Sequence, residues 1–332
     1  MAARLLYNSH AMKDIEGQER CGIVLAGAKD ARLRGLIHYL RGSAVPKQYV
    51  NFIGTRSMIE HAFDRTERLV RRECLFAVVT REHLSYPEVE RQLALRPAGT
   101  VLVQPDDRDT GLGILLALAH IHKRRPASVV AVFPADHFVS EEELFMTQVA
   151  MAFYIVENNP SEVILLGVEP DSAEVDYDYI LADGDAESSA APGARRVRLL
   201  VEKPDAALAH ELVASAALWN TTTMVFRTDT AIDLVRRFSS ELYGAFQEIH
   251  SALGTRSEKM TIDTVYRRMK PRCFAHEVLQ KCALANPRVR VLPVSGVFWS
   301  DWGSEPRVVE SLKMSGYFDR LQITADKRAQ LG

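Results

Sequence analysis

The sequence predicts an α/β protein built around a mostly parallel sheet with crossover helices. Two observations lead to this fold class. Short apolar runs, such as 75–79 and 129–133, recur along the chain, and stretches with helical spacing of apolar and charged residues, such as 57–72, lie between them. Strands that alternate with helices in this way are typical of a doubly wound sheet, whose ligands bind beyond the carboxyl ends of the strands.

Each expected element has a local reason. The β-branched apolar runs predict buried strands, and charges interleaved with apolar residues at helical spacing predict surface helices. Strands are expected at 23–26, 75–79, 100–103, 129–133, 163–168, 177–180, 197–201, 221–227 and 289–293. Helices are expected at 57–72, 88–95, 111–123, 141–158 and within 230–269, and Pro160 ends the fourth of them.

Composition narrows the class of partner. The chain has 332 residues, 47% of them hydrophobic, and 41 basic against 43 acidic side chains give a formal charge of −2. This balance favours neither nucleic acid nor an anionic membrane surface as a partner. The four cysteines are widely spaced and form no CxxC pair, so we expect neither a zinc site nor a disulfide framework, and we expect a cytoplasmic protein.

The chain is expected to form one main domain. Residues 1–19 are predicted to be an N-terminal tail without the apolar core of a signal peptide, and no run is long enough to span a membrane. Residues 20–320 are predicted to form the domain, with 230–285 as a helical cap portion, and residues 321–332 are predicted to be a C-terminal tail. No internal repeat is visible.

The stretch from Gly22 to Gln48 carries the first functional signal. An apolar run ends in a turn at Gly27, and Arg32 and then Pro46-Lys47-Gln48 follow. A buried strand that opens into a tight turn presents several backbone N–H groups in one direction, which suits a phosphate chain, and nearby cations would offset the charge of that chain.

These residues resemble the signature of a known family. LAGAKDARL, followed by PKQY, is similar to the LAGG-x-G-x-RL and PKQ motifs of the sugar-1-phosphate nucleotidyltransferases, most of all to their mannose-1-phosphate guanylyltransferase branch. The resemblance implies a three-layer, Rossmann-like (GT-A-like) fold with a mixed, mostly parallel central sheet. Ala28 and Asp30 stand where the family has glycines, so this chain adds a Cβ at one position and a carboxylate at the other.

The resemblance assigns roles to the residues of this motif. Arg32 and Lys47 would stabilise the triphosphate and the leaving pyrophosphate. The nucleotide would contact a set of strand and turn residues, namely Leu25, Ala26, Gly27 and Ala28.

A second segment begins at Arg108. Arg108 and Thr110 match a family segment similar to RNTAPA that lies against the nucleotide, whereas Asp109 replaces its asparagine. Without the family, a polar residue before an apolar run is an ordinary helix cap.

Two aspartates are candidate metal ligands. Asp136, in PADH, follows an expected strand, and Asp301 lies in SDWGSEP, which resembles the family's closing motif. The resemblance implies that both bind Mg²⁺, and that Asp136 also lies at the nucleotide. Without the resemblance, Asp136 is equally well explained as a helix cap. His137 is then a residue that packs beside it.

Three residues are candidates for contact with the sugar phosphate. Glu202-Lys203-Pro204 resembles the family motif VEKP, in which the lysine meets the phosphate and the glutamate meets sugar hydroxyls. Asn220, in WNT, offers a donor and an acceptor to a sugar. A solvent-exposed lysine and a turn asparagine are the alternatives, and Tyr177 and Tyr179 either flank the sugar or pack.

Together these motifs predict an enzyme that joins a sugar-1-phosphate, with mannose-1-phosphate expected, to a nucleoside triphosphate, with GTP expected, and releases pyrophosphate. Catalysis by Arg32, Lys47 and Lys203 would rest on positioning and charge stabilisation. The alternative is a nucleotide- or sugar-nucleotide-binding regulatory protein that lost catalysis through Ala28 and Asp30. A dinucleotide dehydrogenase is disfavoured because GAKDAR lacks the G-x-G-x-x-G fingerprint. The sequence does not determine the oligomeric state, and a homodimer is compatible with it.

Overall fold

A computed structural model gives the fold for most of the chain. It describes residues 19–29, 32–42, 44–184, 191–285, 288–314 and 316–318. Apart from Glu19, the expected tails at 1–19 and 321–332 lie outside the described residues, as does Asp30.

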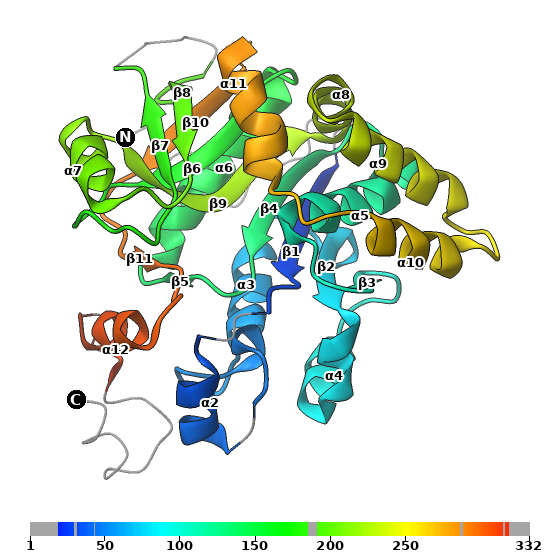
Figure 1. Ribbon diagram of the computed structural model, residues 1–332, viewed down its shortest axis with the longest axis horizontal. Coiled ribbons are helices and arrows are strands. Elements are labelled where there is room, and N and C mark those ends of the chain that lie inside the picture. Colours follow the sequence, from blue (N-terminus) through cyan, green and yellow to red (C-terminus); the bar gives the residue numbers. More distant parts are fainter. Residues whose placement is uncertain are drawn as a thin grey trace.

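A nine-stranded sheet forms the centre of the molecule, in the order β3-β2-β1-β4-β9-β6-β10-β8-β7 (Figure 1). Its strands are β1 (Arg20–Ala26), β2 (Leu75–Thr80), β3 (Val101–Gln104), β4 (Val129–Pro134), β6 (Val163–Val168), β7 (Tyr179–Ala182), β8 (Arg195–Val201), β9 (Leu218–Arg227) and β10 (Val289–Val294). A separate two-stranded sheet pairs β5 (Phe138–Val139) with β11 (Trp299–Ser300).

The central sheet is mixed, with a parallel majority around its middle. Strands β1, β2, β3 and β4 run parallel to one another, and β6 runs parallel to β10. Strand β9 lies antiparallel between β4 and β6, so these two groups share one direction. The carboxyl ends of β1, β4, β6 and β10 and the start of β9 therefore meet at one edge of the sheet.

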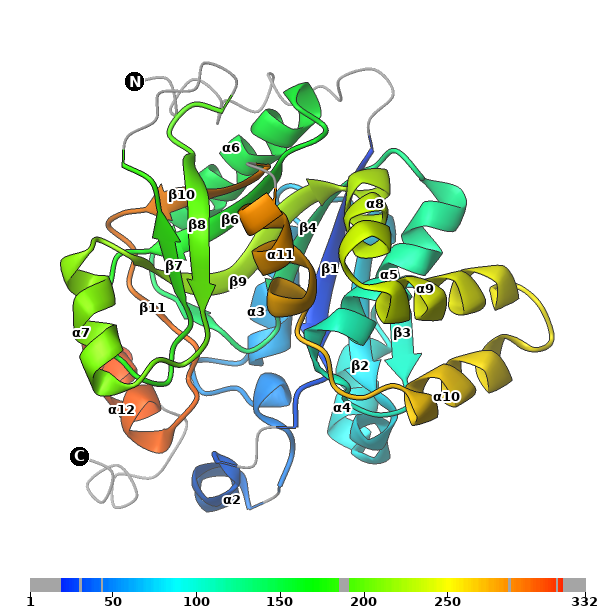
Figure 2. The same ribbon diagram turned by 45° about the horizontal axis from the view of Figure 1, so that its top comes forward.

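Helices cover both faces of the sheet, which gives three layers (Figure 2). Their bounds are α2 (Arg34–Arg41), α3 (Met58–Thr66), α4 (Pro87–Leu93), α5 (Asp109–Arg124), α6 (Glu142–Asn158), α7 (Ala206–Ala214), α8 (Thr228–Phe238), α9 (Ser240–Ala252), α10 (Glu258–Arg268), α11 (Lys281–Ala285) and α12 (Glu305–Met314). Helices α3 and α6 pack on one face, α5, α8 and α11 lie on the other, and α9 packs outside α5.

Local sequence explains the main elements. All six residues of β4 are buried, as expected for a central strand covered on both faces. Helix α5 lies between the sheet and α9, and it is correspondingly apolar, with residues 111–119 all buried. Helix α3 begins with a capping box, in which the Ser57 and Glu60 side chains each accept a hydrogen bond from the other's backbone N–H.

The expected fold class is confirmed, with one helix that was not among the expected elements. The segment between Arg32 and Pro46, in which no helix was expected, contains α2. The sequence explains this helix, because Leu33, Leu36 and Ile37 have helical spacing and are all buried. Gly42 ends the helix in the left-handed conformation, with φ 71°. Helices α8, α9 and α10 account for the predicted helical stretch within 230–269.

Within the described part of the chain, no helix combines the length and the apolar character that crossing a lipid bilayer would require.

Candidate functional site

Two cavities adjoin at the edge of the sheet where the strand ends meet. The larger cavity has a volume of about 460 Å³ and includes Leu25, Gly27 and Asp136 in its lining. The smaller cavity has a volume of about 190 Å³. Both are lined by Asp109 and Thr110, and they share Thr222 as well, so they are continuous around the start of α5 and β9.

The turn after β1 forms one wall of the larger cavity. The Gln48 side chain donates a 2.7 Å hydrogen bond to the carbonyl of Ala26, and the Thr80 hydroxyl donates a 2.8 Å bond to the carbonyl of Gly27. A Cβ added at Gly27 would overlap the buried Gln104 amide, which is itself held by Thr80 and Tyr266. This position therefore needs glycine for space.

Ala28 fits the turn without backbone strain. It is exposed and lines the larger cavity, and it is absent from the described non-glycine residues with positive φ. The additional Cβ therefore does not force the turn into the left-handed region. The other departure from the family pattern, Asp30, lies outside the described residues.

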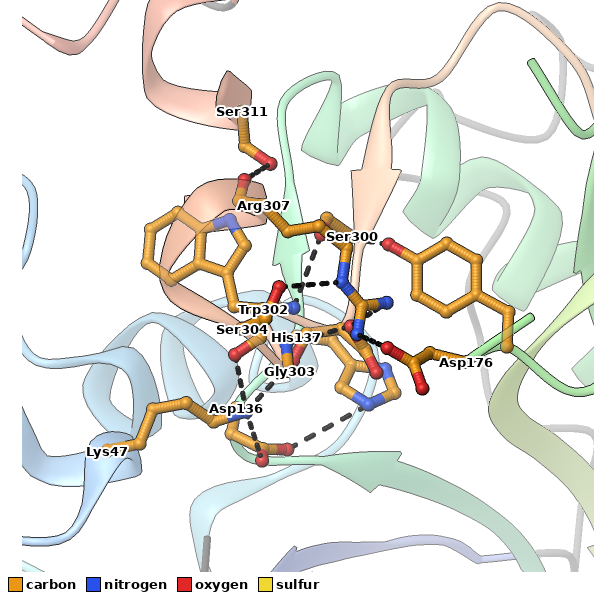
Figure 3. Close-up of polar contacts among 12 residues, drawn as sticks. Lys47, Asp136, His137, Asp176, Ser300, Trp302, Gly303, Ser304, Arg307 and Ser311 are labelled. Carbon is orange, nitrogen blue, oxygen red and sulfur yellow. Dashed lines mark hydrogen bonds and ion pairs between the residues drawn. The ribbon is translucent and has the colours of Figure 1, made fainter. Parts of the chain in front are cut away.

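Lys47 joins three segments of the chain (Figure 3). Its ammonium lies 2.9 Å from the Asp136 carboxylate and donates hydrogen bonds to the carbonyls of Asp301, at 2.9 Å, and Trp302, at 3.2 Å. The Lys47 side chain is only 3% exposed and that of Asp136 17%. Residues 47, 136 and 301 are thus brought together around one nearly buried cation.

Arg307 neutralises the second aspartate. Its guanidinium lies 3.0 Å from the Asp301 carboxylate and 3.2 Å from that of Asp176 (Figure 3). The Asp301 carboxylate also accepts a 2.9 Å bond from the backbone N–H of Gly303. A Cβ on Gly303 would lie 2.9 Å from the Arg32 guanidinium, so Arg32 reaches the same turn.

Electrostatics at this end of the site favour an ionised aspartate and a neutral histidine. Burial opposes the charge on Asp136, but Lys47 and His137 outweigh it and lower the pKa of the carboxyl. Burial lowers the pKa of His137 despite Asp136 and Asp301 nearby. His137 lines the larger cavity, and its Nδ1 is buried without a hydrogen-bond partner among the described residues.

The smaller cavity gathers the sugar-phosphate candidates. Glu202, Lys203 and Asn220 all line it, together with Thr110, although they come from separate segments. The Glu202 carboxylate lies 3.2 Å from the His276 imidazole and is 54% exposed. The Asn220 side chain accepts a 3.0 Å hydrogen bond from the backbone N–H of Thr222, which fixes its orientation.

A carboxylate that the motifs did not indicate also lines this cavity. Asp178 lies just before β7, and its side chain accepts a 3.3 Å hydrogen bond from the backbone N–H of Lys203. Burial, and next the Glu202 carboxylate, raise the pKa of Asp178.

Some candidates lie elsewhere in this structure. Ala26 is buried in β1, where its carbonyl accepts from Gln48. The Arg108 side chain bonds the carbonyl of Tyr266 at 3.1 Å and lines neither cavity. Tyr177 packs edge-on against Trp219, with ring centres 4.7 Å apart, and Tyr179 donates to a backbone carbonyl, so both have packing roles here.

Strained backbone concentrates around the two cavities. Five described non-glycine residues have positive φ, and three of them, Asp109 (64°), Lys203 (38°) and Thr222 (60°), line the smaller cavity. A fourth, Trp302 (48°), follows Asp301. Such conformations persist where surrounding contacts hold them, and they often accompany functional sites.

Sequence reasoning missed the residues that hold the site in shape. Gln104 and Tyr266 build the wall behind Gly27, and Arg307 pairs with Asp301. Gln104 ends β3 at the ligand edge of the sheet, which is a signal that could have been used. Tyr266 and Arg307 are an aromatic and a cation on surface helices, and no local pattern distinguishes them from their neighbours.

Fold and site together define an α/β protein with a glycine turn, a lysine and two aspartates at the ligand edge of its sheet. The chain belongs to the nucleotidyl transferase family, whose model matches residues 21–312. It is similar to the xanthan biosynthesis protein XanB of Xanthomonas campestris, with 26% identity over 227 residues, 68% of this chain and 46% of that protein. It is also similar to mannose-1-phosphate guanylyltransferase 2 of Escherichia coli O157:H7, with 24% identity over 85% of this chain and 58% of that protein. The chain thus spans about half the length of the curated relatives it matches.

Solved structures agree on the fold. One described as mannose-1-phosphate geranyltransferase from Thermus thermophilus superposes with a TM-score of 0.73 at 24% identity, over 89% of this chain and 79% of that one. A UDP-glucose pyrophosphorylase complexed with UDP-glucose gives a TM-score of 0.54 at 14% identity, over 91% of this chain and 99% of that one. These likenesses support the Rossmann-like three-layer architecture.

Proposed function

We propose that the protein is a nucleotidyltransferase that joins a sugar-1-phosphate to a nucleoside triphosphate and releases pyrophosphate, with mannose-1-phosphate and GTP as the first substrates to test. The observation that carries this proposal is the Lys47 contact, which brings the Asp136 carboxylate and the backbone of Asp301 to one point beside the turn at Gly27. Family membership and relatives named as mannose-1-phosphate guanylyltransferases support the choice of substrates.

Asp136 and Asp301 are the proposed ligands of a magnesium ion, because Mg²⁺ is commonly held by one or two carboxylates, with substrate phosphates completing its shell. In this structure these carboxylates are paired with Lys47 and Arg307, and within the described residues no group of three or more histidine, cysteine or acidic side chains gathers around a metal position. The lowered pKa of Asp136 keeps that carboxylate ionised at neutral pH. When bound, the ion would supply positive charge at the reacting phosphate.

The protein's own residues would position two anions for reaction. The larger cavity would hold the triphosphate along the Gly27 turn, and Lys203 would bind the sugar phosphate in the smaller cavity. Lys47 and Arg32 lie outside the cavity lining and would act from behind it, Lys47 through Asp136 and Arg32 from the turn at Gly303. The attacking phosphate oxygen is already ionised, so no side-chain nucleophile is required. Catalysis then consists of bringing two like charges together and compensating them.

A feature of the larger cavity supports guanine as the base. Asp107 and Asp109 line it, and one oxygen of the Asp107 carboxylate accepts a 3.0 Å hydrogen bond from the backbone N–H of Asp109, which fixes its orientation. Guanine presents an N–H and an amino group side by side, and a carboxylate that accepts from both makes a favourable pair of hydrogen bonds. Asp107 is our candidate for this contact.

The test is pyrophosphate release from each of the four nucleoside triphosphates with mannose-1-phosphate and Mg²⁺. We expect turnover with GTP, and a loss of about a hundredfold or more in kcat for Lys203→Met, which removes one charge from the smaller cavity. A matched control is Lys313→Met, on α12 and outside both cavities, which should keep the parental rate.

Thermal shifts with the same nucleotides distinguish an active enzyme from a nucleotide-binding regulatory protein without catalysis. A ligand that binds the native state raises the melting temperature, and the rise grows with the logarithm of its concentration relative to its dissociation constant. Stabilisation by GTP without turnover of any sugar phosphate would favour the regulatory binding protein. Absence of both stabilisation and turnover with all four nucleotides would contradict the proposal.

A further inference from the structure

A third cavity, which we call the edge cavity, lies beside β3 at the end of the central sheet and has a volume of about 950 Å³. Residues of β3 and α5 line it, together with the turn that joins α9 to α10 (Figure 2). It shares no lining residue with the two cavities of the candidate site. Cavities that hold small molecules commonly measure about 300–1,000 Å³, so this one has room for a ligand of nucleotide size.

Basic side chains dominate the charged lining of the edge cavity. The only carboxylate in that lining belongs to Glu258, and it already accepts a 2.6 Å hydrogen bond from the backbone N–H of Gly254. The whole chain has a formal charge of −2, so the positive charge here is a local excess. The basic side chains are Arg81, Lys123, Arg124, Arg256 and Lys259.

Two of these cations have partners within the protein, and three do not. Arg81 pairs with Asp263 at 2.5 Å, and the Lys123 ammonium donates a 2.6 Å hydrogen bond to the carbonyl of Leu253 at the carboxyl end of α9. Among the described residues, no ion pair or side-chain hydrogen bond is made by Arg124, Arg256 or Lys259. Like charges that are gathered in this way repel one another, and an anion between them would offset the repulsion.

The titration of His120 reports the same positive field. His120 lines the edge cavity, and burial lowers its pKa. The nearby cations of Arg124 and Lys123 also lower the pKa, although Glu258 acts in the opposite direction.

The uncharged part of the lining is mostly apolar. It comes from β3, α5, the turn after α9 and α10, and includes Val101, Val103, Leu116, Leu253 and Ile262. A ligand that matches both parts has an apolar or aromatic body and an anionic end. One phosphate group carries about 1.5–2 negative charges at neutral pH, so two phosphate groups would balance the three unpaired cations. Arginine also suits phosphate, because its planar guanidinium can donate two parallel hydrogen bonds.

We propose that the edge cavity binds an organic molecule with two phosphate groups, of the nucleoside diphosphate class. Arg124, Arg256 and Lys259 hold the phosphates, and the apolar lining holds the base. This site goes beyond the proposed function and is independent of it, since no residue of the candidate site takes part.

The probes are ADP, pyrophosphate and adenosine, and binding is measured by calorimetry on the full chain without Mg²⁺. We expect ADP to bind more tightly than pyrophosphate, because only ADP buries an apolar ring against the lining. Adenosine lacks the phosphates and should bind more weakly than ADP by about tenfold or more. Failure of ADP to bind, or equal binding of ADP and adenosine, would overturn the proposal.

The matching variant carries Arg256→Gln and Lys259→Gln, which remove two exposed charges from the edge cavity. Its affinity for ADP should fall by about tenfold. The control carries Arg267→Gln and Lys270→Gln, which remove two exposed charges in and just after α10 and outside all three cavity linings, and it should keep the parental affinity. Urea denaturation checks that both variants fold.

The control also distinguishes this site from general attraction and from the larger cavity. Equal losses in the two variants would mean that ADP responds only to the overall charge. An affinity that survives Arg256→Gln with Lys259→Gln would mean that ADP binds elsewhere, and either result contradicts the proposal. No sugar phosphate or turnover enters these measurements, so failure of nucleotidyl transfer would leave the proposed site standing.

Discussion

The two cavities of the candidate site differ in whether their carboxylates are paired with a cation in the free protein. In the larger cavity, Asp136 is matched by the nearly buried Lys47, whose remaining hydrogens bond the carbonyls at 301 and 302. In the smaller cavity, the Asp178 carboxylate accepts a 3.3 Å hydrogen bond from the Lys203 backbone N–H, and its pKa is raised first by burial and next by the nearby Glu202 carboxylate. In the free protein Asp136 is paired with a cation, whereas the three carboxylates of the smaller cavity outnumber the one lysine in the same lining.

This difference teaches where stability and selectivity reside. Removal of one partner of a buried ion pair destabilises the fold, because it leaves the other charge buried and uncompensated. A charge that is unpaired in the free protein opposes folding and is satisfied only by a ligand. We therefore expect substitutions in the larger cavity to destabilise the fold and the Asp178 substitution to stabilise it.

Lys47→Met should have the largest effect. It leaves Asp136 buried without its cation, so the free energy of unfolding should fall by about 3–5 kcal/mol, as measured by urea denaturation. The exposed pair of Lys29 with Asp106, at 2.8 Å, gives a control: Lys29→Met should cost less than about 1 kcal/mol. Equal losses for the two variants would mean that burial of Lys47 does not strengthen its pairing.

His83 should control part of the acid sensitivity of the folded protein. It is buried beside Tyr49, and burial lowers its pKa to about 4, so the folded protein holds it neutral. The unfolded chain takes up the proton near pH 6.5, so stability is full above that value and is lost as the pH falls from 6.5 towards 4. The total loss is about 3 kcal/mol.

Denaturation of the parent and of His83→Gln at pH 7 and pH 5 isolates this contribution. The parent should lose more stability than the variant over this interval, by about 2 kcal/mol. Parallel losses in both proteins would mean that His83 titrates normally in the folded state.

Gly27→Ala should have a smaller effect that concentrates on ligand binding. The new Cβ must displace the Gln104 amide from Thr80 and Tyr266, which should cost about 1–3 kcal/mol of stability and weaken nucleotide binding. Gly35→Ala is the control, because nothing lies within 4 Å of a Cβ there and Gly35 lies within α2. That control should gain about 0.5–1 kcal/mol, as alanine does in a helix.

Asp178→Asn should have the smallest effect, and the opposite sign to Lys47→Met. The raised pKa means that ionisation of this carboxyl costs stability as the pH rises above its unfolded value of about 4. At pH 7 the asparagine variant should be more stable by up to about 1 kcal/mol, seen as a small rise in melting temperature. A loss of stability would show that the Asp178 carboxylate has favourable contacts in the free protein, as the Asp136 carboxylate has in the larger cavity.

The sequence predicted the elements whose evidence is local. Strands such as Val129–Pro134 are continuous apolar runs, and their ends carry the motif residues because a sheet aligns its carboxyl ends. Helix α2 was not expected, although the spacing of Leu33, Leu36 and Ile37 before Gly42 is a local signal for it.

The remaining features depend on pairs that are distant in sequence. The Tyr266 hydroxyl donates a hydrogen bond to the Gln104 side chain across 162 positions of the sequence. Neither residue belongs to a local sequence pattern that predicts this contact. Likewise, Asp178 looks like one more acidic residue before a strand. Its lack of a cationic neighbour within ion-pair distance, among the residues that the structure describes, is a property of the folded surroundings, which no window of sequence contains.

The bond between Lys47 and the carbonyl of Asp301 spans 254 positions of the chain. During synthesis, the amino-terminal lysine is made long before its acceptor, and the last central strand, β10, is also among the late segments. A nascent chain that stops short of residue 301 therefore cannot close this end of the molecule. The ligand edge can therefore assemble only after synthesis has passed residue 302, and truncation before that residue should damage that edge before it damages the sheet around β1.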